Sequence, residues 1–260
     1  MRLPMQMLST AFAITLSATA SLGGEMHIVH CLKGCPTGTP ETNDLIVREI
    51  FALSSNDETK FADWVAYRVT SETIGTSKSL SRDWEADPFL DDNETLEPDD
   101  YKKAFNQLHT DRGHLAPLAS FAGTIFWRST NILSNITPQK SNLNQGAWVA
   151  LESAVRDLAY TRKEIYVVTG PLYDADENQM TLPEADETHT VPTGYFKVVA
   201  SDTGAMTAFI FDQDTDRNAN YCDHIKSLTD VETASGLDLF PEASTWPTGN
   251  LNNALGCSPE

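Results

Sequence analysis

A short motif in the middle of the chain contains a histidine in the surroundings of a catalytic base. In Asp111-Arg112-Gly113-His114, the glycine permits close approach of the backbone, and an arginine lies two residues before the histidine. Histidine has an unperturbed pKa of about 6.5, so its neutral ring can accept a proton from water at neutral pH. A single histidine more often has a structural role, but this basic, glycine-containing context favours chemistry on phosphate.

An amide-rich segment leads into the most regular helical pattern of the chain. Residues 131–146 read NILSNITPQKSNLNQG. A helix is predicted over residues 145–161, because apolar residues recur there at spacings of four, three and four: Ala147, Leu151, Ala154 and Leu158. Asn144 lies at the start of this helix, where its amide could cap the first turn or bind a hard cation.

Glu152 and Arg156 are one turn apart on this helix, in the acid-before-base order that favours an ion pair. Such a pair is usually a solvated surface contact. The alternative, which the amide-rich helix start just upstream favours, is that Glu152 and Arg156 belong to a functional site. Eight residues of ideal helix separate Asn144 and Glu152 by about 12 Å along the axis. Both can therefore serve one ion only if the first turn is irregular and water bridges to Glu152.

The amino-acid composition indicates a folded and strongly acidic protein. The 260 residues include 37 acids and 18 bases, which gives a net charge of −19, and 40% are hydrophobic. These values exclude disordered, collagen-like and polytopic membrane proteins. The net charge argues against a polyanionic partner, but its distribution weakens that argument. Residues 83–100 contain nine acids and no base, and residues 174–187 contain six acids and no base, whereas residues 102–163 contain eight bases and three acids.

The N-terminus has the three parts of a secretory signal peptide. Arg2 is followed by an apolar run over residues 7–16 and by a small-x-small cleavage site, Ala18-Thr19-Ala20. A buried N-terminal helix is the alternative. Cleavage near residue 20 removes one arginine and no acid, leaving residues 21–260 with a charge of −20. No later run approaches 18 apolar residues, so this mature chain is expected to be soluble outside the cytoplasm.

Four cysteines fit an oxidising compartment. Their even number predicts two disulfides, and local pairing is the simplest of three connectivities: Cys31 with Cys35, and Cys222 with Cys257. The alternative is a metal site in which His27 and His30 join the first cysteine pair. The lack of a second close pair of cysteines or histidines disfavours this alternative.

Strand patterns outnumber helical patterns and occur in clusters. A hairpin is predicted from residues 45–53 and 62–70 around the turn 54–57, with further strands at 165–169, 195–200 and 206–211. Helices are predicted at 97–105 and 227–235 in addition to 145–161. Because strands do not alternate with helices, the predicted class is α+β, with a largely antiparallel central sheet flanked by helices. No linker or repeat divides residues 21–260, so a single domain is expected.

The motif and several further segments resemble the DNA/RNA non-specific endonuclease family. The matching segments follow one another in order along nearly all of residues 21–260: 31–36 (CLKGCP), 60–67 (KFADWVAY), 111–114 (DRGH), 134–141 (SNITPQKS) and 169–173 (TGPLY). The resemblance implies the family's ββα-metal motif, a hairpin followed by a helix around one divalent cation. It therefore also implies a metal-dependent nuclease.

The resemblance implies a role for each matching residue. His114 is expected to be the general base, Asn144 the one direct protein ligand of Mg²⁺ (or of Mn²⁺ in its place), and Glu152 a contact to the ion through water. Arg82, Arg112 and Arg156 are expected to contact phosphate or stabilise the transition state. Asn135 is expected to bind substrate or fix its loop.

The implied function is that of a secreted or periplasmic endonuclease acting on single- and double-stranded DNA and RNA, leaving 5′-phosphate and 3′-hydroxyl ends. One alternative is a secreted phosphodiesterase acting on small nucleotides. The other is a catalytically silent nucleic-acid-binding homologue. Trp127 and Trp148 could stack on bases, but core packing is favoured for both. Homodimers occur among relatives, and no feature of this sequence locates an interface.

Overall fold

A seven-stranded antiparallel sheet forms the centre of the computed structural model, which describes residues 26–174 and 180–257. The predicted signal peptide lies outside the described residues. The strand order is β1-β2-β3-β6-β7-β8-β9. The strands are β1 (Asp44–Val47), β2 (Ala52–Ser55), β3 (Ala62–Thr70), β6 (Glu164–Leu172), β7 (Gly194–Ala200), β8 (Met206–Asp212) and β9 (Ile225–Lys226). The α+β class is confirmed, as are the three predicted strands that lie within β6, β7 and β8.

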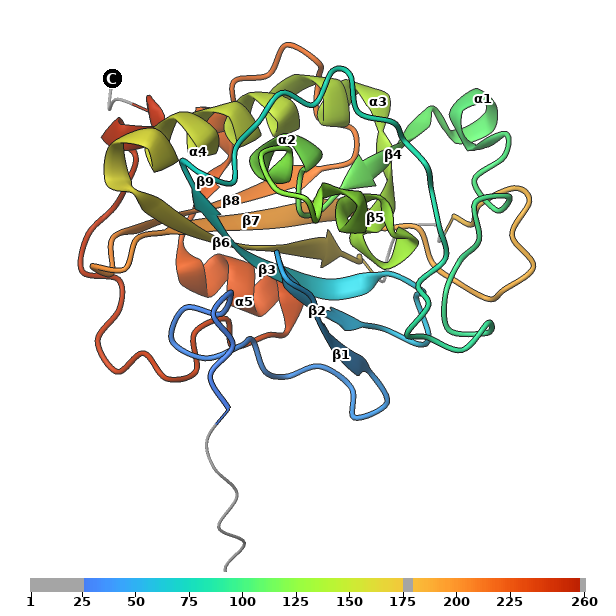
Figure 1. Ribbon diagram of the computed structural model, residues 1–260, viewed down its shortest axis with the longest axis horizontal. Helices are drawn as coiled ribbons and strands as arrows, with labels where there is room; N and C mark the ends of the chain where they lie inside the picture. Colours follow the sequence, from blue (N-terminus) through green and yellow to red (C-terminus); the bar gives the residue numbers. More distant parts are fainter. Residues whose placement is uncertain (1–25, 175–179, 258–260) are drawn as a thin grey trace, which may run out of the picture.

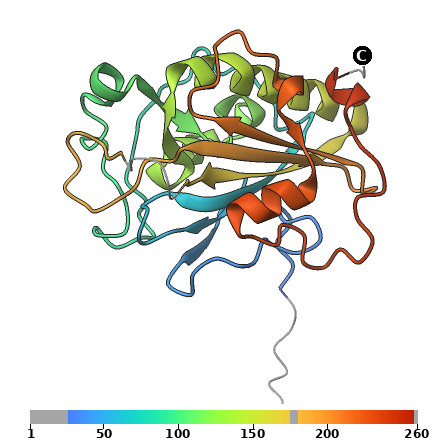
Figure 2. The ribbon, with the colours of Figure 1, turned by 180° about the vertical axis from the view of Figure 1, so that it is seen from behind.

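Helices cover both faces of this sheet. Figures 1 and 2 show α4 (Val149–Arg162) on one side and α5 (Leu228–Ser235) on the other. Consecutive residues of β3 point to opposite faces of the sheet. Val65 packs in the core under α4, whereas Trp64 packs in the core that includes α5. Each fully buried apolar side chain contributes about 1.5–3 kcal/mol to stability. Among the described residues, none of the helices is long and apolar enough to cross a membrane.

A separate two-stranded sheet carries the DRGH motif. In it β4 (Thr110–His114) pairs antiparallel with β5 (Ile136–Lys140), so that Thr110 lies opposite Lys140 and His114 opposite Ile136. The connection contains α2 (Leu118–Phe121), η1 (Trp127–Asn131) and η2 (Leu133–Asn135). After β5 the chain enters α4 through α3 (Ser141–Leu143) and η3 (Asn144–Trp148). The predicted hairpin followed by a helix is confirmed.

The start of this helix is irregular, as a shared ion site requires. Asn144 has helical angles (φ −56°, ψ −46°), so it does not act as an N-cap. The turn η3 is a π-helix, and within it Gly146 adopts a non-helical conformation (φ −114°, ψ −115°). A Cβ atom on Gly146 would lie 2.3 Å from the backbone oxygen of Arg217, so no other residue fits there. The regular helix therefore begins at Val149 and not at residue 145.

Two predicted elements are wrong in detail. The stretch 45–53 is two strands, because the chain turns between Val47 and Ala52, with the Arg48 N–H donating to the Phe51 carbonyl at 2.9 Å. The predicted helix over 97–105 is a series of turns, and α1 (Ala104–Leu108) begins only at its end. Lys103 has a positive φ of 64°, which a continuous right-handed helix cannot contain. In addition, the Asp100 carboxylate accepts from the Glu97 N–H at 2.6 Å, a local turn that competes with helix.

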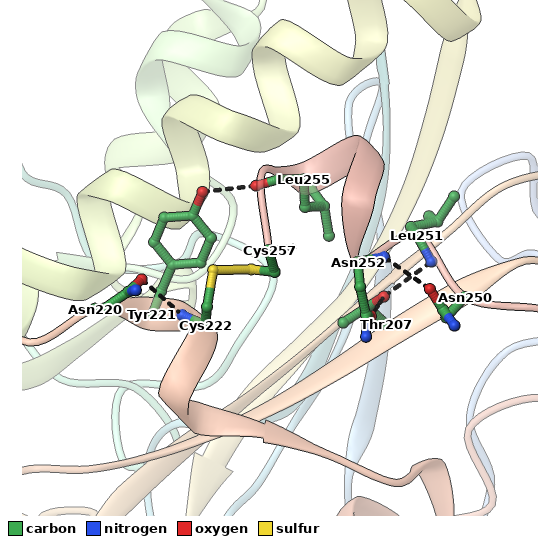
Figure 3. Close-up of a disulfide and its surroundings, with 9 residues drawn as sticks. All are labelled: Thr207, Asn220, Tyr221, Cys222, Asn250, Leu251, Asn252, Leu255 and Cys257. Carbon is green, nitrogen blue, oxygen red and sulfur yellow. Dashed lines mark hydrogen bonds between the residues drawn. A yellow bond between two sulfur atoms is a disulfide. The ribbon is translucent and has the colours of Figure 1, made fainter. Parts of the chain in front are cut away.

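Both predicted disulfides are present. Cys31 is bonded to Cys35 and Cys222 to Cys257, so no thiolate remains for the alternative metal site. The second bond joins Cys222, in η4 (Tyr221–His224), to Cys257, two residues after the end of η5 (Asn253–Leu255) (Figure 3).

Side-chain hydrogen bonds attach the C-terminal segment to β8 and η4. Thr207 of β8 donates to the Asn252 side chain at 2.7 Å and accepts from the Leu251 N–H at 3.0 Å. The Tyr221 hydroxyl donates to the Leu255 carbonyl at 2.6 Å. Together with the disulfide, these bonds fix residues 251–257 against the layer that contains α4.

Replacing Gly146 tests whether the helix start must be irregular. Gly146→Ala places Cβ against a backbone oxygen that cannot move freely, and we expect a loss of about 2 kcal/mol in the free energy of unfolding, or about 4–8 °C in Tm. Gly249→Ala is the matched control, because nothing lies within 4 Å of its Cβ position. Equal melting temperatures for the two variants would contradict the expectation.

Candidate active site

The carboxylate of Asp111 joins β4 to the start of the helix. It accepts hydrogen bonds from Ser141 Oγ at 2.7 Å, Asn144 Nδ2 at 2.9 Å and Gln145 Nε2 at 2.8 Å. Because the amide nitrogen of Asn144 is used, its Oδ1 is directed away from Asp111 and is available as a ligand. Asp111 is a functional residue that its position in the motif alone did not reveal.

The donors at this position fit a hard divalent cation. Asn144 offers a neutral amide oxygen, and Glu152, half-buried in the first turn of α4, offers a carboxylate. Oxygen donors of this kind suit Mg²⁺ and Mn²⁺, whereas a zinc site would need imidazole or thiolate. Gln139 packs against Gly113, and both polar atoms of its buried amide lack a partner among the described residues, which leaves them for ordered water. The two groups of three carboxylates found in the described residues contain none of these residues: Asp44, Asp57 and Glu94; Asp100, Asp186 and Glu187.

His114 is held in one tautomer at the end of β4. Its Nε2 lies 3.2 Å from Asn131 Oδ1, and Asn131 Nδ2 donates to the Ser81 carbonyl at 3.2 Å. The second bond fixes the orientation of the Asn131 amide, so Nε2 carries the hydrogen and Nδ1 has the free lone pair. Burial lowers the pKa of His114 to about 4, and the positive charge of Arg82 acts in the same direction, against the Asn131 bond. The ring is therefore neutral at pH 7.

A buried lysine lies beneath the helix start. Lys197 of β7 is completely buried, with Nζ 4.1 Å from the ring centroid of Trp148 and 3.4 Å from the Tyr67 hydroxyl. Burial lowers the pKa of Lys197 to about 8, while the negative charge of Glu152 raises it. Burial likewise raises the pKa of Glu152, against the positive charges of Lys197 and Arg156. Lys197 was missed in the sequence, where a single lysine within the apolar run 195–200 was the available signal.

The predicted surface ion pair between Glu152 and Arg156 does not form. Arg156 Nη2 donates to Ser153 Oγ at 3.3 Å, and its Nη1 is buried without a hydrogen-bond partner among the described residues. Arg82 is exposed, donates to the Leu80 carbonyl at 3.0 Å, and lies near enough to His114 to influence its pKa. Both guanidinium groups therefore keep donors for a further acceptor.

Arg112 and Asn135 are held by protein contacts. Arg112 Nη2 donates to the Pro98 carbonyl at 2.7 Å, and its guanidinium lies 5.6 Å from the Trp84 ring and 5.0 Å from the Tyr101 ring. Asn135 is completely buried. Its amide bonds to both backbone groups of Ala116 and to the Thr130 carbonyl, at 2.8 to 3.0 Å. These contacts favour the loop-fixing role for Asn135 over substrate binding.

The two tryptophans singled out in the sequence differ. Trp148 is 1% exposed and packs in the main core, as predicted. Trp127 is half-buried, with the guanidinium of Arg128 lying 4.6 Å from its ring centroid.

Comparison with known proteins decides the family. The model of the DNA/RNA non-specific endonuclease family matches residues 32–245. The chain belongs to this family. As a member of the non-specific endonuclease family it is similar to the nuclease of Serratia marcescens, with 41% identity over 266 aligned positions that cover 100% of this chain and 98% of the relative. Mitochondrial endonuclease G of Bos taurus is 28% identical and covers 78% of this chain and 71% of its own length.

A solved structure shares the fold of this family member. A chain in a crystal structure of the EndoG/EndoGI complex superimposes with a TM-score of 0.67 at 24% identity, covering 80% of this chain and 89% of that chain. Membership of this family, together with the relatives named as nucleases, identifies the protein as a hydrolase of the nuclease class.

Asn131 provides a test of how the histidine is positioned. Asn131→Ala removes the acceptor that fixes the His114 tautomer, and we expect kcat for nucleic acid hydrolysis to fall about 10- to 100-fold, the effect of losing a group that orients a metal-bound imidazole. The exposed Asn253 supplies the control, since Asn253→Ala should keep full activity. An Asn131→Ala protein as active as the control would show that the hydrogen bond has no role in orientation.

Proposed function

We propose that the protein is an exported endonuclease that hydrolyses phosphodiester bonds in single- and double-stranded DNA and RNA, leaving 5′-phosphate and 3′-hydroxyl ends. The observation that carries the proposal is the neutral, oriented ring of His114, on the strand whose Asp111 fixes Asn144. A base on β4, and an oxygen donor that β4 holds through Asp111, provide what in-line hydrolysis of a phosphodiester needs.

In this proposal His114 accepts the proton of the attacking water at Nδ1, because Nε2 is engaged by Asn131. Asn144 would hold Mg²⁺ directly, and Glu152 would hold it through water, with Mn²⁺ able to substitute. A bound cation would supply neutralisation of charge on the phosphate and leaving oxygens. Arg82 and Arg156 have donors left to bind phosphate oxygens and to stabilise the charge that develops on them.

Broad substrate range follows from the kind of contacts available. Arginine contacts to phosphate carry no information about base sequence, and they occur in both DNA and RNA. Residues 102–163 supply a local excess of basic residues in an otherwise acidic chain. The overall charge therefore weakens long-range attraction without preventing local phosphate binding.

The proposed location is secreted or periplasmic, with residues 1–20 as the signal peptide and 21–260 as one nuclease domain. Both disulfides support an oxidising compartment.

Plasmid digestion tests the activity and its base together. We expect the mature protein to nick closed circular plasmid with Mg²⁺ and not with EDTA. His114→Ala should reduce the rate about 10²- to 10⁴-fold, the usual contribution of a general base. A His114→Ala protein that nicks at the wild-type rate would refute the mechanism. Release of mononucleotides without internal nicks would instead identify a phosphodiesterase of small nucleotides, and inactivity on all substrates a silent binding homologue.

The pH dependence of kcat/KM tests the state of the histidine. A general base works when neutral, so a pKa lowered to about 4 keeps His114 functional down to that pH. We expect no fall in kcat/KM near the ordinary histidine value of 6.5, and a fall only at lower pH, where Glu152 and His114 take up protons. Asn131→Asp keeps the acceptor but adds a negative charge, so it should move this acidic limb to higher pH. Circular dichroism at each pH separates titration from unfolding, and a wild-type limb near 6.5 would contradict the expectation.

A further inference from the structure

A pocket of about 290 Å³ adjoins the candidate site and shares Asp111 with it. Its lining includes three aromatic residues, Trp84, Tyr101 and Phe105, together with Ala104 and with Thr110, Asp111 and Arg112 of β4. Its size suits a group of a few atoms to one ring system, at the lower limit of small-molecule sites.

Strand geometry connects this pocket to the proposed base. Thr110, Arg112 and His114 alternate along β4, so their side chains project from the same face of the strand. Trp84 completes the connection, because its ring contributes to the pocket and its centroid lies 5.5 Å from that of His114. A substrate cleaved beside His114 therefore passes next to the pocket.

The aromatic lining favours a flat ligand. Phe105 is 60% exposed although it is apolar, which leaves one ring available for stacking. Thr110 is only 2% exposed, yet its hydroxyl has no hydrogen-bond partner among the described residues. The Nε–H of Arg112 is also buried and lacks a partner there. Aromatic walls match a nucleobase, which has π-faces.

The same lining disfavours a phosphate. The Arg112 guanidinium is already engaged by the Pro98 carbonyl and by two rings. Tyr101 directly follows Asp99 and Asp100, and the Asp100 carboxylate lies within 4.8 Å of those of Asp186 and Glu187. An anion entering the pocket would approach this acidic group, whereas an uncharged base would not be repelled.

We propose that this pocket binds the base of an unpaired nucleotide next to the cleaved phosphodiester, with Phe105 and Trp84 as stacking surfaces. The inference rests on the proposed nuclease function and adds a base subsite to it. Every base has a π-face, so the subsite contributes affinity without selecting a sequence.

Binding to oligonucleotides with and without bases tests the subsite. The mature protein carrying His114→Ala is titrated in EDTA with two fluorescently labelled single-stranded DNA octamers. One octamer has normal bases, and the other has the same phosphates with an abasic tetrahydrofuran at every position. We expect the normal octamer to bind about 10-fold more tightly, the effect of one stacked base.

Phe105→Ala, added to this protein, should reduce that ratio at least 3-fold and leave the affinity for the abasic octamer unchanged, because its effect requires a base. Trp84→Ala should act in the same way. Tyr160→Ala removes a ring that is 58% exposed on α4, and it should keep the full ratio.

Two outcomes overturn the subsite: equal weakening of both octamers by Phe105→Ala, or no change in either. The proposed function fails separately, if the protein with His114 intact and Mg²⁺ present does not cleave the normal octamer.

Discussion

The hydrogen bonds that converge on the Asp111 carboxylate hold the candidate site together. They connect the strand that ends in His114 to the turn that carries Asn144, and they set which atom of the Asn144 amide is free. The contact of Gly146 with the backbone of Arg217 fixes the same turn from the other side. These constraints make the helix start irregular, so the separation of Asn144 and Glu152 along an ideal helix does not apply here.

Burial is the largest influence on three charged or titratable groups around this turn. It lowers the pKa of His114 and of Lys197 and raises that of Glu152, in each case towards the neutral form. The charges of Lys197 and Glu152 each favour the charged form of the other, so removing one changes the pKa of the other. A poorly hydrated site also strengthens every interaction with a developing charge, which is where electrostatic stabilisation is most effective.

Local pattern predicted the regular elements well and the site only in part. Apolar spacing placed α4, β3, β6, β7 and β8, because burial against one sheet dictates those patterns. The same reasoning failed at residues 97–103, where side chains of the acids form turns that a helical pattern does not reveal. Family resemblance pointed to His114 and Asn144, while Asn131 and Lys197 were missed because their partners are distant in the sequence. The tautomer of His114 depends on Ser81, 50 residues from Asn131, which no spacing rule could indicate.

The close contact of Gly146 with the Arg217 backbone also determines how early in biosynthesis the candidate site can form. The DRGH motif and the helix leave the ribosome well before residue 217, and Lys197 of β7 also follows them in the chain. Synthesis proceeds from the N-terminus at about 5–20 residues per second, so an incomplete chain lacks both the surface under the helix start and the charge beneath it. The active arrangement is therefore a late product of folding, and a chain exported before it folds carries no assembled site across the membrane.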